Sequence, residues 1–258
     1  MSLETKSRAI VLHTTRQGDS SLVIHVLDEI AGRQSLFLRG VGKGRRTSAA
    51  AAFHPLAVLE VVTEATPRSS LLYLREFEPV LSLPGLRTDI RRSAVAQFVC
   101  EVLWRTLRTG DGDPELFTWL VECVAALETL PGEAAGGPGE PGVAGVANFA
   151  LWWLVGYCAR MGFRPEDNWT ADEAAVFNIV SARFGPAFEG QEEALFSREE
   201  SLLLHRLLTL PFDEAMALPL SAARRGAFSR RMLAYLSHHL GQSLEIRSLD
   251  VLHAVFAD

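Results

Sequence analysis

Hydrophobic and polar residues alternate along the first part of the chain, up to about Pro79, and follow helical spacing beyond Pro84. Runs rich in Val, Ile, Leu and aromatic residues, separated by turn segments, predict β-strands at residues 8–14, 22–28, 33–39, 56–63 and 71–78. Strands of this length with short connections are typical of a small antiparallel barrel. One connection is longer and runs from Gly40 to about Pro55.

Beyond Pro84, apolar residues recur three or four positions apart in segments that predict helices over residues 90–103, 116–127, 152–161 and 222–240. The last of these is expected to stop at Gly241, and a short helix is expected from about Leu249. The Gly/Pro-rich stretch at 131–142 predicts a loop. The pattern therefore predicts an α+β protein with a barrel domain at residues 1–80 and a mainly α-helical domain at 81–258.

Two further helices are predicted from their amino-terminal signals. The pairs Thr170 with Glu173 and Ser197 with Glu200 fit capping boxes, in which each side chain satisfies the other residue's backbone amide. Residues 184–196 show no regular period, and the pattern assigns them to no element.

Composition narrows the class of protein. The 258 residues are 48% hydrophobic and contain no uncharged apolar run of membrane-spanning length. Residues 1–8 are polar and lack the apolar segment of a secretory signal, so we expect a cytoplasmic protein. Cys100, Cys123 and Cys158 lie far apart in apolar helical patterns, and we expect buried free thiols rather than a disulfide or a metal site.

The formal net charge of −6 hides an asymmetry. Residues 1–80 hold ten Lys and Arg against eight Asp and Glu, a balance of +2, whereas residues 81–258 have a balance of −8. If the chain binds nucleic acid, the amino-terminal part is the expected surface.

Strand alternation sorts the third and fifth predicted strands into two faces. Leu36 and Leu38 are expected inside the barrel, as are Leu72 and Leu74. The opposite face then carries arginine and aromatic side chains, namely Arg33, Phe37, Arg39, Tyr73, Arg75 and Phe77. Guanidinium groups pair with phosphates and rings offer a stacking surface for any base, so this face predicts binding of single-stranded nucleic acid.

The connection after Gly40 extends this face with Lys43, Arg45 and Arg46, three cations within four residues. Its glycines let the backbone approach a ligand closely. An alternative interpretation is that the aromatic residues are covered by the helical domain and the arginines are merely solvated. The predicted nucleic-acid-binding residues are Arg33, Phe37, Arg39, Lys43, Arg45, Arg46, Tyr73 and Arg75.

Segments along the whole chain resemble the recombination mediator family RecO in order and spacing. They are residues 8–12, 18–23, 32–33, 40–44, 54–56, 161–165, 233–241 and 247–252. The resemblance implies an OB-fold joined to a helical domain. It also implies binding of single- and double-stranded DNA, annealing of complementary strands, contacts with single-stranded DNA-binding protein and with RecR, and help in loading RecA.

Many members of that family carry a four-cysteine zinc module after a Gly-(Phe/Tyr)-x-Pro element. This chain has Asn168, Trp169 and Thr170 at that place and no cysteine pair, so no zinc or other cofactor is expected. An acidic partner tail that ends in an apolar residue would need a hydrophobic pocket rimmed by cations. The clustered arginines of the helical domain are Arg91 with Arg92, Arg160 with Arg164, Arg224 with Arg225, and Arg230 with Arg231.

Catalytic motifs fail on their spacing. Lys43 is followed by Gly44 and not by Ser or Thr, and Phe37 stands where a phosphate-binding loop needs its first glycine. Ser20 has no Gly-x-Ser-x-Gly context and fits a hairpin turn. We therefore expect a DNA-binding mediator and no enzyme. The alternative is a protein–protein scaffold whose barrel binds no nucleic acid.

Overall fold

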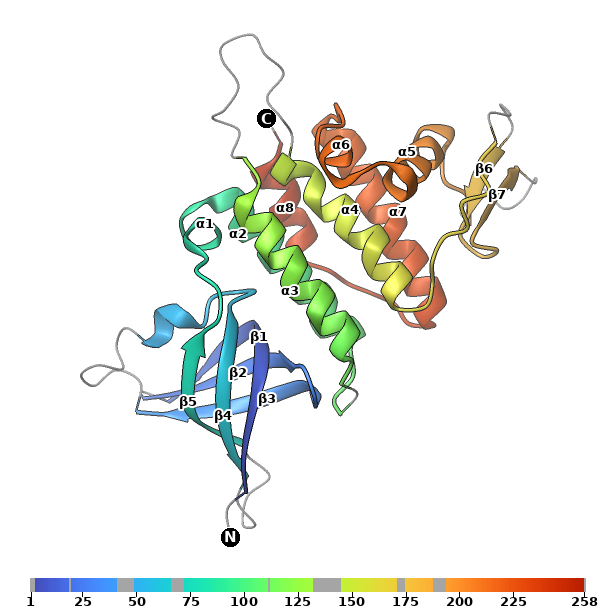
Figure 1. Ribbon diagram of the computed structural model, residues 1–258. Helices are drawn as coiled ribbons and strands as arrows, with labels where there is room; N and C mark the ends of the chain where they lie inside the picture. The colour runs from blue at the N-terminus through green and yellow to red at the C-terminus, as the bar shows by residue number, and fades with distance from the viewer. Residues whose placement is uncertain are drawn as a thin grey trace, which may run out of the picture. The chain divides into compact units, whose positions relative to one another are not determined.

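A computed structural model describes residues 3–18, 20–40, 49–65, 72–110, 112–131, 145–170, 175–187 and 194–257. It divides into two compact units, Met1–Thr129 and Leu130–Asp258. The first unit contains the barrel and three helices, and the second contains the remaining helices and a short hairpin (Figure 1). The predicted domain boundary near residue 80 stays a prediction.

Five strands close a barrel in the order β1-β2-β3-β5-β4. Their bounds are β1 Leu3–Gln17, β2 Ser21–Asp28, β3 Gly32–Arg39, β4 Val58–Ala65 and β5 Leu72–Pro79. All neighbours are antiparallel except β3 and β5, which pair in parallel. A five-stranded barrel with this order is an OB-type fold, and the predicted fold class is confirmed.

The alternation predicted for β3 is confirmed. Leu36 and Leu38 are buried in the barrel, whereas Ser35 and Arg39 are exposed on its outside. The inner face of the barrel is filled by aliphatic residues of all five strands and by Phe53.

The predicted outward position of Phe77 is wrong. The register between β4 and β5 shifts between Val62 and Thr63, so that Arg75 is the extra residue of a bulge. A one-residue shift moves all following side chains to the other face. Phe77 consequently lies opposite the buried Val61, and its ring centroid is 4.7 Å from that of Phe53 at the barrel core.

Three helices complete the first unit: α1 Pro84–Thr88, α2 Ile90–Thr106 and α3 Pro114–Thr129. Asp89 caps α2 by accepting from the amide of Arg91. Helix α2 packs on β1, and the Cys100 thiol lies 3.5 Å from the Val11 carbonyl oxygen. From α3, the ring of Phe117 lies 5.3 Å below the guanidinium of Arg8 on β1.

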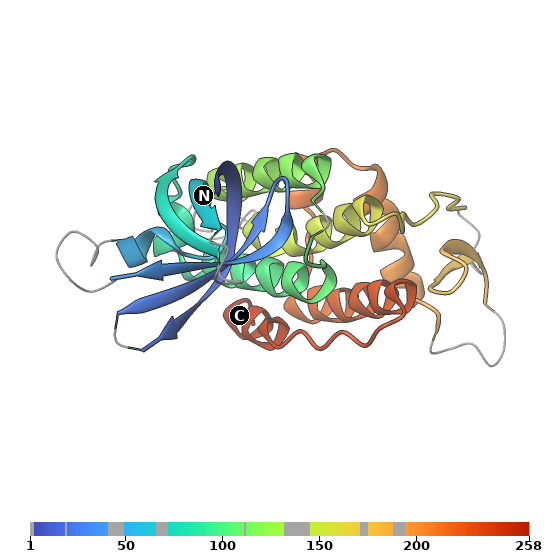
Figure 2. The same cartoon turned by 90° about the horizontal axis from the view of Figure 1, so that it is seen from below.

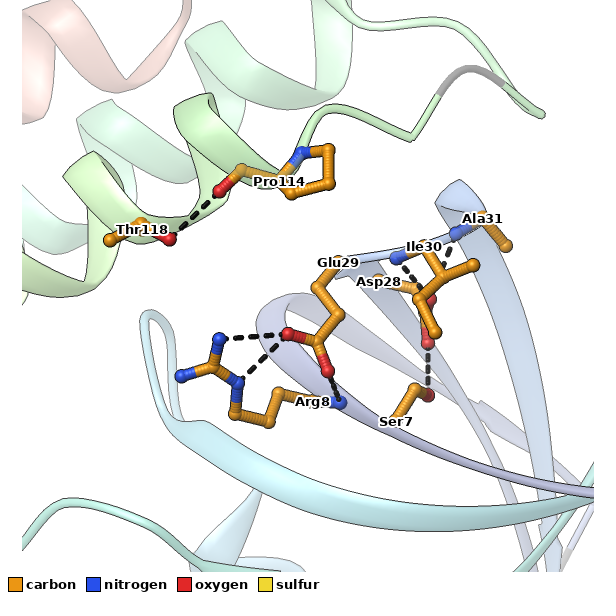
Figure 3. Close-up of polar contacts among 8 residues, drawn as sticks. All are labelled: Ser7, Arg8, Asp28, Glu29, Ile30, Ala31, Pro114 and Thr118. Carbon is orange, nitrogen blue, oxygen red and sulfur yellow. Dashed lines mark hydrogen bonds and ion pairs between the residues drawn. The ribbon is translucent and has the colours of Figure 1, made fainter.

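The turn between β2 and β3 is held by Asp28, which is buried together with Ser7 (Figure 3). The Ser7 hydroxyl donates to Asp28 Oδ2 at 2.5 Å, and the amides of Ile30 and Ala31 both donate to Oδ1 at 2.9 Å. Next to it, Arg8 donates from its backbone amide and its guanidinium to the Glu29 carboxylate, each at 2.8 Å. These contacts tie the β2–β3 turn to β1.

The second unit contains α4 Gly145–Arg160, α5 Arg198–Thr209, α6 Phe212–Met216, α7 Ala222–Leu240 and α8 Ser248–Val255. Helices α4 and α7 pack against each other, as two views show (Figure 1, Figure 2). The Asn148 side-chain amide donates to the carbonyls of Ala215, Met216 and Leu218, which secures the end of α6. Among the described helices, none is both long and apolar enough to cross a membrane.

Two predicted helix boundaries are confirmed here. Ser197 and Glu200 form a reciprocal capping box at the start of α5. Helix α7 ends at Gly241, whose φ of 64° is the left-handed conformation that glycine adopts without a steric penalty. The predicted short carboxyl-terminal helix is α8.

The helix predicted from Thr170 and Glu173 is wrong, and the stretch left unassigned after it is partly regular. A hairpin occupies this region, with strands β6 Ala175–Asn178 and β7 Arg183–Pro186. Asn178 Oδ1 accepts from the amides of Val180 and Ser181, which favours a turn. Glu173 lies outside the described residues.

Tertiary packing explains the hairpin. Phe177 on β6 is fully buried, with ring centroids 5.1 Å from Phe184 and Phe196 and 5.5 Å from Tyr235. The Asn168 side chain also donates to the Phe184 carbonyl and accepts from its amide. Burial of these rings outweighs the local capping signal.

Replacing Asp28 should destabilise the barrel. In Asp28→Ala, the buried Ser7 hydroxyl and two turn amides lose their acceptor. We expect the free energy of unfolding to fall by about 1–3 kcal/mol in urea titrations. The control is Thr118→Ala, which removes an exposed hydroxyl bond to the Pro114 carbonyl and should change stability by less than about 0.5 kcal/mol. Equal stability of the two variants would contradict this role of Asp28.

Candidate nucleic-acid interface

The parallel register of β3 and β5 brings two aromatic residues together on the outside of the barrel. Phe37 pairs with Tyr73, and their ring centroids are 5.7 Å apart in an edge-to-face arrangement. Both side chains are half-buried, so each keeps part of its surface open to solvent. They form an aromatic platform on one outer face.

Arg39 lies over this platform. Its Nη2 donates to the Tyr73 hydroxyl at 3.1 Å, and its guanidinium carbon is 4.9 Å from the Tyr73 ring centroid and 5.6 Å from that of Phe37. The ring faces attract the cation and orient it while the residue remains exposed. We call Phe37, Arg39 and Tyr73 the Arg39 cluster.

Arg75 lies beside the Arg39 cluster and forms an ion pair. Its guanidinium carbon is 5.7 Å from the Tyr73 ring centroid, and it forms an ion pair with Glu64 on β4. A phosphate at Arg75 therefore has to compete with a carboxylate. The ion pair between Arg75 and Glu64 therefore lies at the edge of the cationic part of this face.

Arg33 is on the same outer face of β3 but is separate from the Arg39 cluster. Its Nη1 donates to the Trp104 carbonyl at 2.6 Å, and its guanidinium carbon lies 4.2 Å from the Trp104 ring centroid. Helix α2 therefore fixes the direction of Arg33. A guanidinium has five N–H donors, so donors remain for an anion.

Sequence reasoning missed His13 on β1 and His25 on β2, which stack at 4.1 Å next to Trp104. His25 Nδ1 also lies 2.9 Å from the Ser35 hydroxyl. Burial lowers the pKa of His13 to about 4, with further contributions from His25 and Arg33. Burial and then Arg33 lower the pKa of His25. Strict alternation from Ala9 and Val11 would place His13 inside the barrel, but the register shift between Val11 and His13 places it opposite His25 on the outer face. Trp104 is too distant in sequence for a local pattern to include it.

The structure thus brings together four of the predicted residues, Phe37, Arg39, Tyr73 and Arg75, and places Arg33 at the far end of β3. Lys43, Arg45 and Arg46 lie outside the described residues. Their part in the interface stays a prediction.

Another part of the barrel surface is acidic. Lys6 on β1 lies 2.6 Å from Glu60, and their hydrogen bond raises the pKa of Lys6, with Glu78 and Glu76 contributing further. Three carboxylates around one lysine disfavour a polyanion there. The outer surface therefore separates into an acidic part and the face that holds the Arg39 cluster.

The described residues contain no group of three or more His, Cys, Asp or Glu side chains that could hold a metal ion. All three cysteines are buried and free, as predicted. Burial raises the pKa of Cys100 and of Cys158 to about 12, which keeps both thiols protonated and unreactive at neutral pH.

The fold and the site define a class of protein: an OB-type barrel with an exposed arginine over two aromatic rings, followed by a mainly helical region. Two family models match the chain. "Recombination protein O N terminal" matches residues 1–83, and "Recombination protein O C terminal" matches residues 87–248. The chain belongs to the RecO family of DNA repair proteins, which confirms the resemblance seen in the sequence.

Similar proteins span nearly the same length. The chain is 23% identical over 251 residues to DNA repair protein RecO of Azobacteroides pseudotrichonymphae, covering 97% of this chain and 98% of that protein. It is 25% identical over 255 residues to DNA repair protein RecO of Bacteroides fragilis, with coverage of 97% and 98%. The protein of that name from Phocaeicola vulgatus is 26% identical over 255 residues, with coverage of 98% and 99%.

The histidine pair should make stability depend on pH. The pKa of His13 is lowered from 6.5 to about 4 in the fold, so between these values the unfolded chain binds a proton that the folded barrel does not. The free energy of unfolding should therefore fall as the pH is lowered across this window. His13→Gln removes the group, and urea titrations at several pH values should show a shallower fall. An unchanged pH dependence would contradict the assignment.

Proposed function

We propose that this chain binds single- and double-stranded DNA through the outer face of β3 and β5 and anneals complementary strands. In this proposal it helps to load RecA onto DNA coated by single-stranded DNA-binding protein, and it works with RecR in the cytoplasm. The observation that carries the proposal is the Arg39 cluster, where one exposed guanidinium lies over two half-open rings. Membership of a family of DNA repair proteins supports it.

The Arg39 cluster suits a ligand that alternates charge and rings. A phosphate can pair with Arg39 while a neighbouring base stacks on Phe37 or Tyr73. Neither contact depends on which base is present, so binding should show little sequence preference. Lys43, Arg45 and Arg46, predicted just beyond β3, would continue the phosphate contacts.

Annealing follows from the same chemistry. Two complementary strands repel each other through their phosphates, and cations on a protein surface reduce that repulsion. The chain acts by binding in this proposal, and it catalyses no covalent step. The alternative is a scaffold that binds only proteins, in which case Arg39 and its rings would serve a protein partner.

Removing the platform should weaken DNA binding. The double variant Phe37→Ala with Tyr73→Ala loses two stacking rings and should raise the Kd for a labelled oligothymidine. Each lost base stack should cost about 1–3 kcal/mol of binding free energy. Fluorescence anisotropy measures this, and thermal melting checks that the barrel remains folded. The matched control is Phe212→Ala, which removes a half-buried ring of the second unit. A folded double variant with wild-type affinity would favour the scaffold alternative.

The second unit offers a candidate site for the acidic tail of single-stranded DNA-binding protein. A groove of about 300 Å³ lies between α5 and α7. Leu202, Leu203, Leu220 and Ala227 line its apolar part, and Leu202 is 37% exposed. A terminal apolar side chain fits such a surface.

Two arginines and the two carboxylates of Glu199 and Glu200 line the polar part of this groove. Arg206 is exposed, and Arg224 pairs with Glu199 at 3.1 Å. Because both partners of that pair are largely exposed, the ion pair is weak and a tail carboxylate can replace Glu199 at little cost. Of the arginine pairs considered from sequence, the pair of Arg224 and Arg225 contributes Arg224 to this groove, which supports Arg224 as the candidate.

Charge reversal at the groove should abolish tail binding. Arg206→Glu with Arg224→Glu should raise the Kd for a synthetic acidic tail peptide by at least about tenfold, measured by anisotropy. The control Arg230→Glu changes an exposed arginine of α7 that does not line the groove, and should bind as the wild type does. Tail affinity that survives in the double variant would exclude the groove.

A further inference from the structure

The chain after α2 contacts the start of β3 through an isolated β-bridge. Thr109 forms an antiparallel bridge with Gly32, and the Arg33 amide donates to the Arg108 carbonyl at 3.4 Å. In an antiparallel pair, the residues next to a bridge are also opposite each other, with side chains on the same face. The backbone of Arg108 therefore lies opposite that of Arg33, next to the bridge, and both residues reach solvent there.

These two arginines have no carboxylate partner among the described residues. The Arg33 guanidinium contacts the Trp104 carbonyl and the Trp104 ring, and Arg108 is exposed. Like charges placed directly opposite on neighbouring strands destabilise the pair of strands. An anion between them would remove that penalty and would use the remaining guanidinium donors.

We propose that Arg33 and Arg108 form a phosphate-binding pair that extends the DNA path from the Arg39 cluster along β3. Trp104 is its positioning residue, because its ring and carbonyl hold the Arg33 guanidinium in place. The inference rests on the proposed DNA binding and adds Arg108 and Trp104, which lie outside the five-stranded barrel, to its contact surface.

The spacing along β3 suits one bound strand. Arg33 and Phe37 are four residues apart on the same strand face, which corresponds to about 13 Å. OB folds bind roughly 4–16 nucleotides of single-stranded nucleic acid. A strand that stacks on Phe37 and Tyr73 is therefore long enough to place another phosphate at Arg33 and Arg108.

The test measures the salt dependence of binding to a labelled oligothymidine of about 15 nucleotides. Arg33→Gln and Arg108→Gln should each reduce the slope of log affinity against log salt by about 0.7, and together by about twice that. Arg108→Glu, at an exposed position where folding is not at risk, should lower affinity further by repulsion. The matched control Arg105→Gln removes an exposed arginine of α2 whose ion pair with Glu101 is 3.9 Å long, and should leave the slope unchanged.

The positioning role of Trp104 is tested by a double-mutant comparison, because general destabilisation of the barrel would not make the effects of two substitutions non-additive. Trp104→Leu removes the ring but keeps the carbonyl, so it should weaken binding by less than Arg33→Gln and should add nothing in the Arg33→Gln background. Trp104→Phe keeps a ring under the guanidinium and should retain most of the affinity. Additive effects of Trp104→Leu and Arg33→Gln would overturn the positioning role.

Two failures are distinguishable. If the Phe37 and Tyr73 variant loses affinity but Arg108→Glu keeps wild-type affinity and slope, the proposed phosphate pair is wrong and the proposed function stands. If the wild-type protein binds no oligonucleotide at low salt, both are wrong.

Discussion

Residues 9–12 of β1 are all buried, so this part of the strand is covered on both of its faces. The organisation of the first unit depends on this burial. Ala9 and Val11 belong to the barrel core, whereas Ile10 and Leu12 point to the other face and are equally buried. An isolated barrel would expose Ile10 and Leu12 to water, so β1 needs a cover, which α2 supplies by packing on it. The same packing brings Trp104, near the end of α2, against Arg33 and the histidine pair, and thereby shapes one end of the outer face of β3.

This cover explains why the first compact unit extends to Thr129 although the strand pattern ends near Pro79. The two family models meet between residues 83 and 87, close to the change from strands to helices. A boundary in sequence pattern and a boundary in packing are different properties. The change of period marks where one type of element replaces another, whereas the apolar outer face of β1 determines which helices stay with the barrel.

The spacing of hydrophobic residues predicted strands and helices best where one face of the element is buried and the other is exposed. The alternation of β3 correctly placed Leu36 and Leu38 inside and Phe37 and Arg39 outside. It failed for Phe77, because a bulge at Arg75 changes the register and leaves no clear mark in the sequence. The capping signal at Thr170 failed because burial of Phe177 among three rings stabilises a hairpin. For the candidate site, the Arg39 cluster followed from alternation, but the contact of Arg33 with Trp104 joins residues 71 apart and no local pattern contains it.

The distribution of charge around the barrel bears on how such a protein handles DNA. The chain is acidic overall, with a net charge of −6, and the carboxylates around Lys6 leave that part of the barrel unsuited to phosphate. In the proposed function, a DNA strand would follow the outer face of β3 and the part of β5 around Tyr73, where Arg75 is already balanced by Glu64. In the proposed function, a cation that is already ion-paired would release fewer counterions on binding, and binding would be easier to reverse. Reversibility matters for annealing, because a strand held too firmly by its bases and phosphates cannot pair along its length with a complement. We infer that the ion-paired Arg75, combined with rings that accept any base, suits a protein that would hold single strands and then release them.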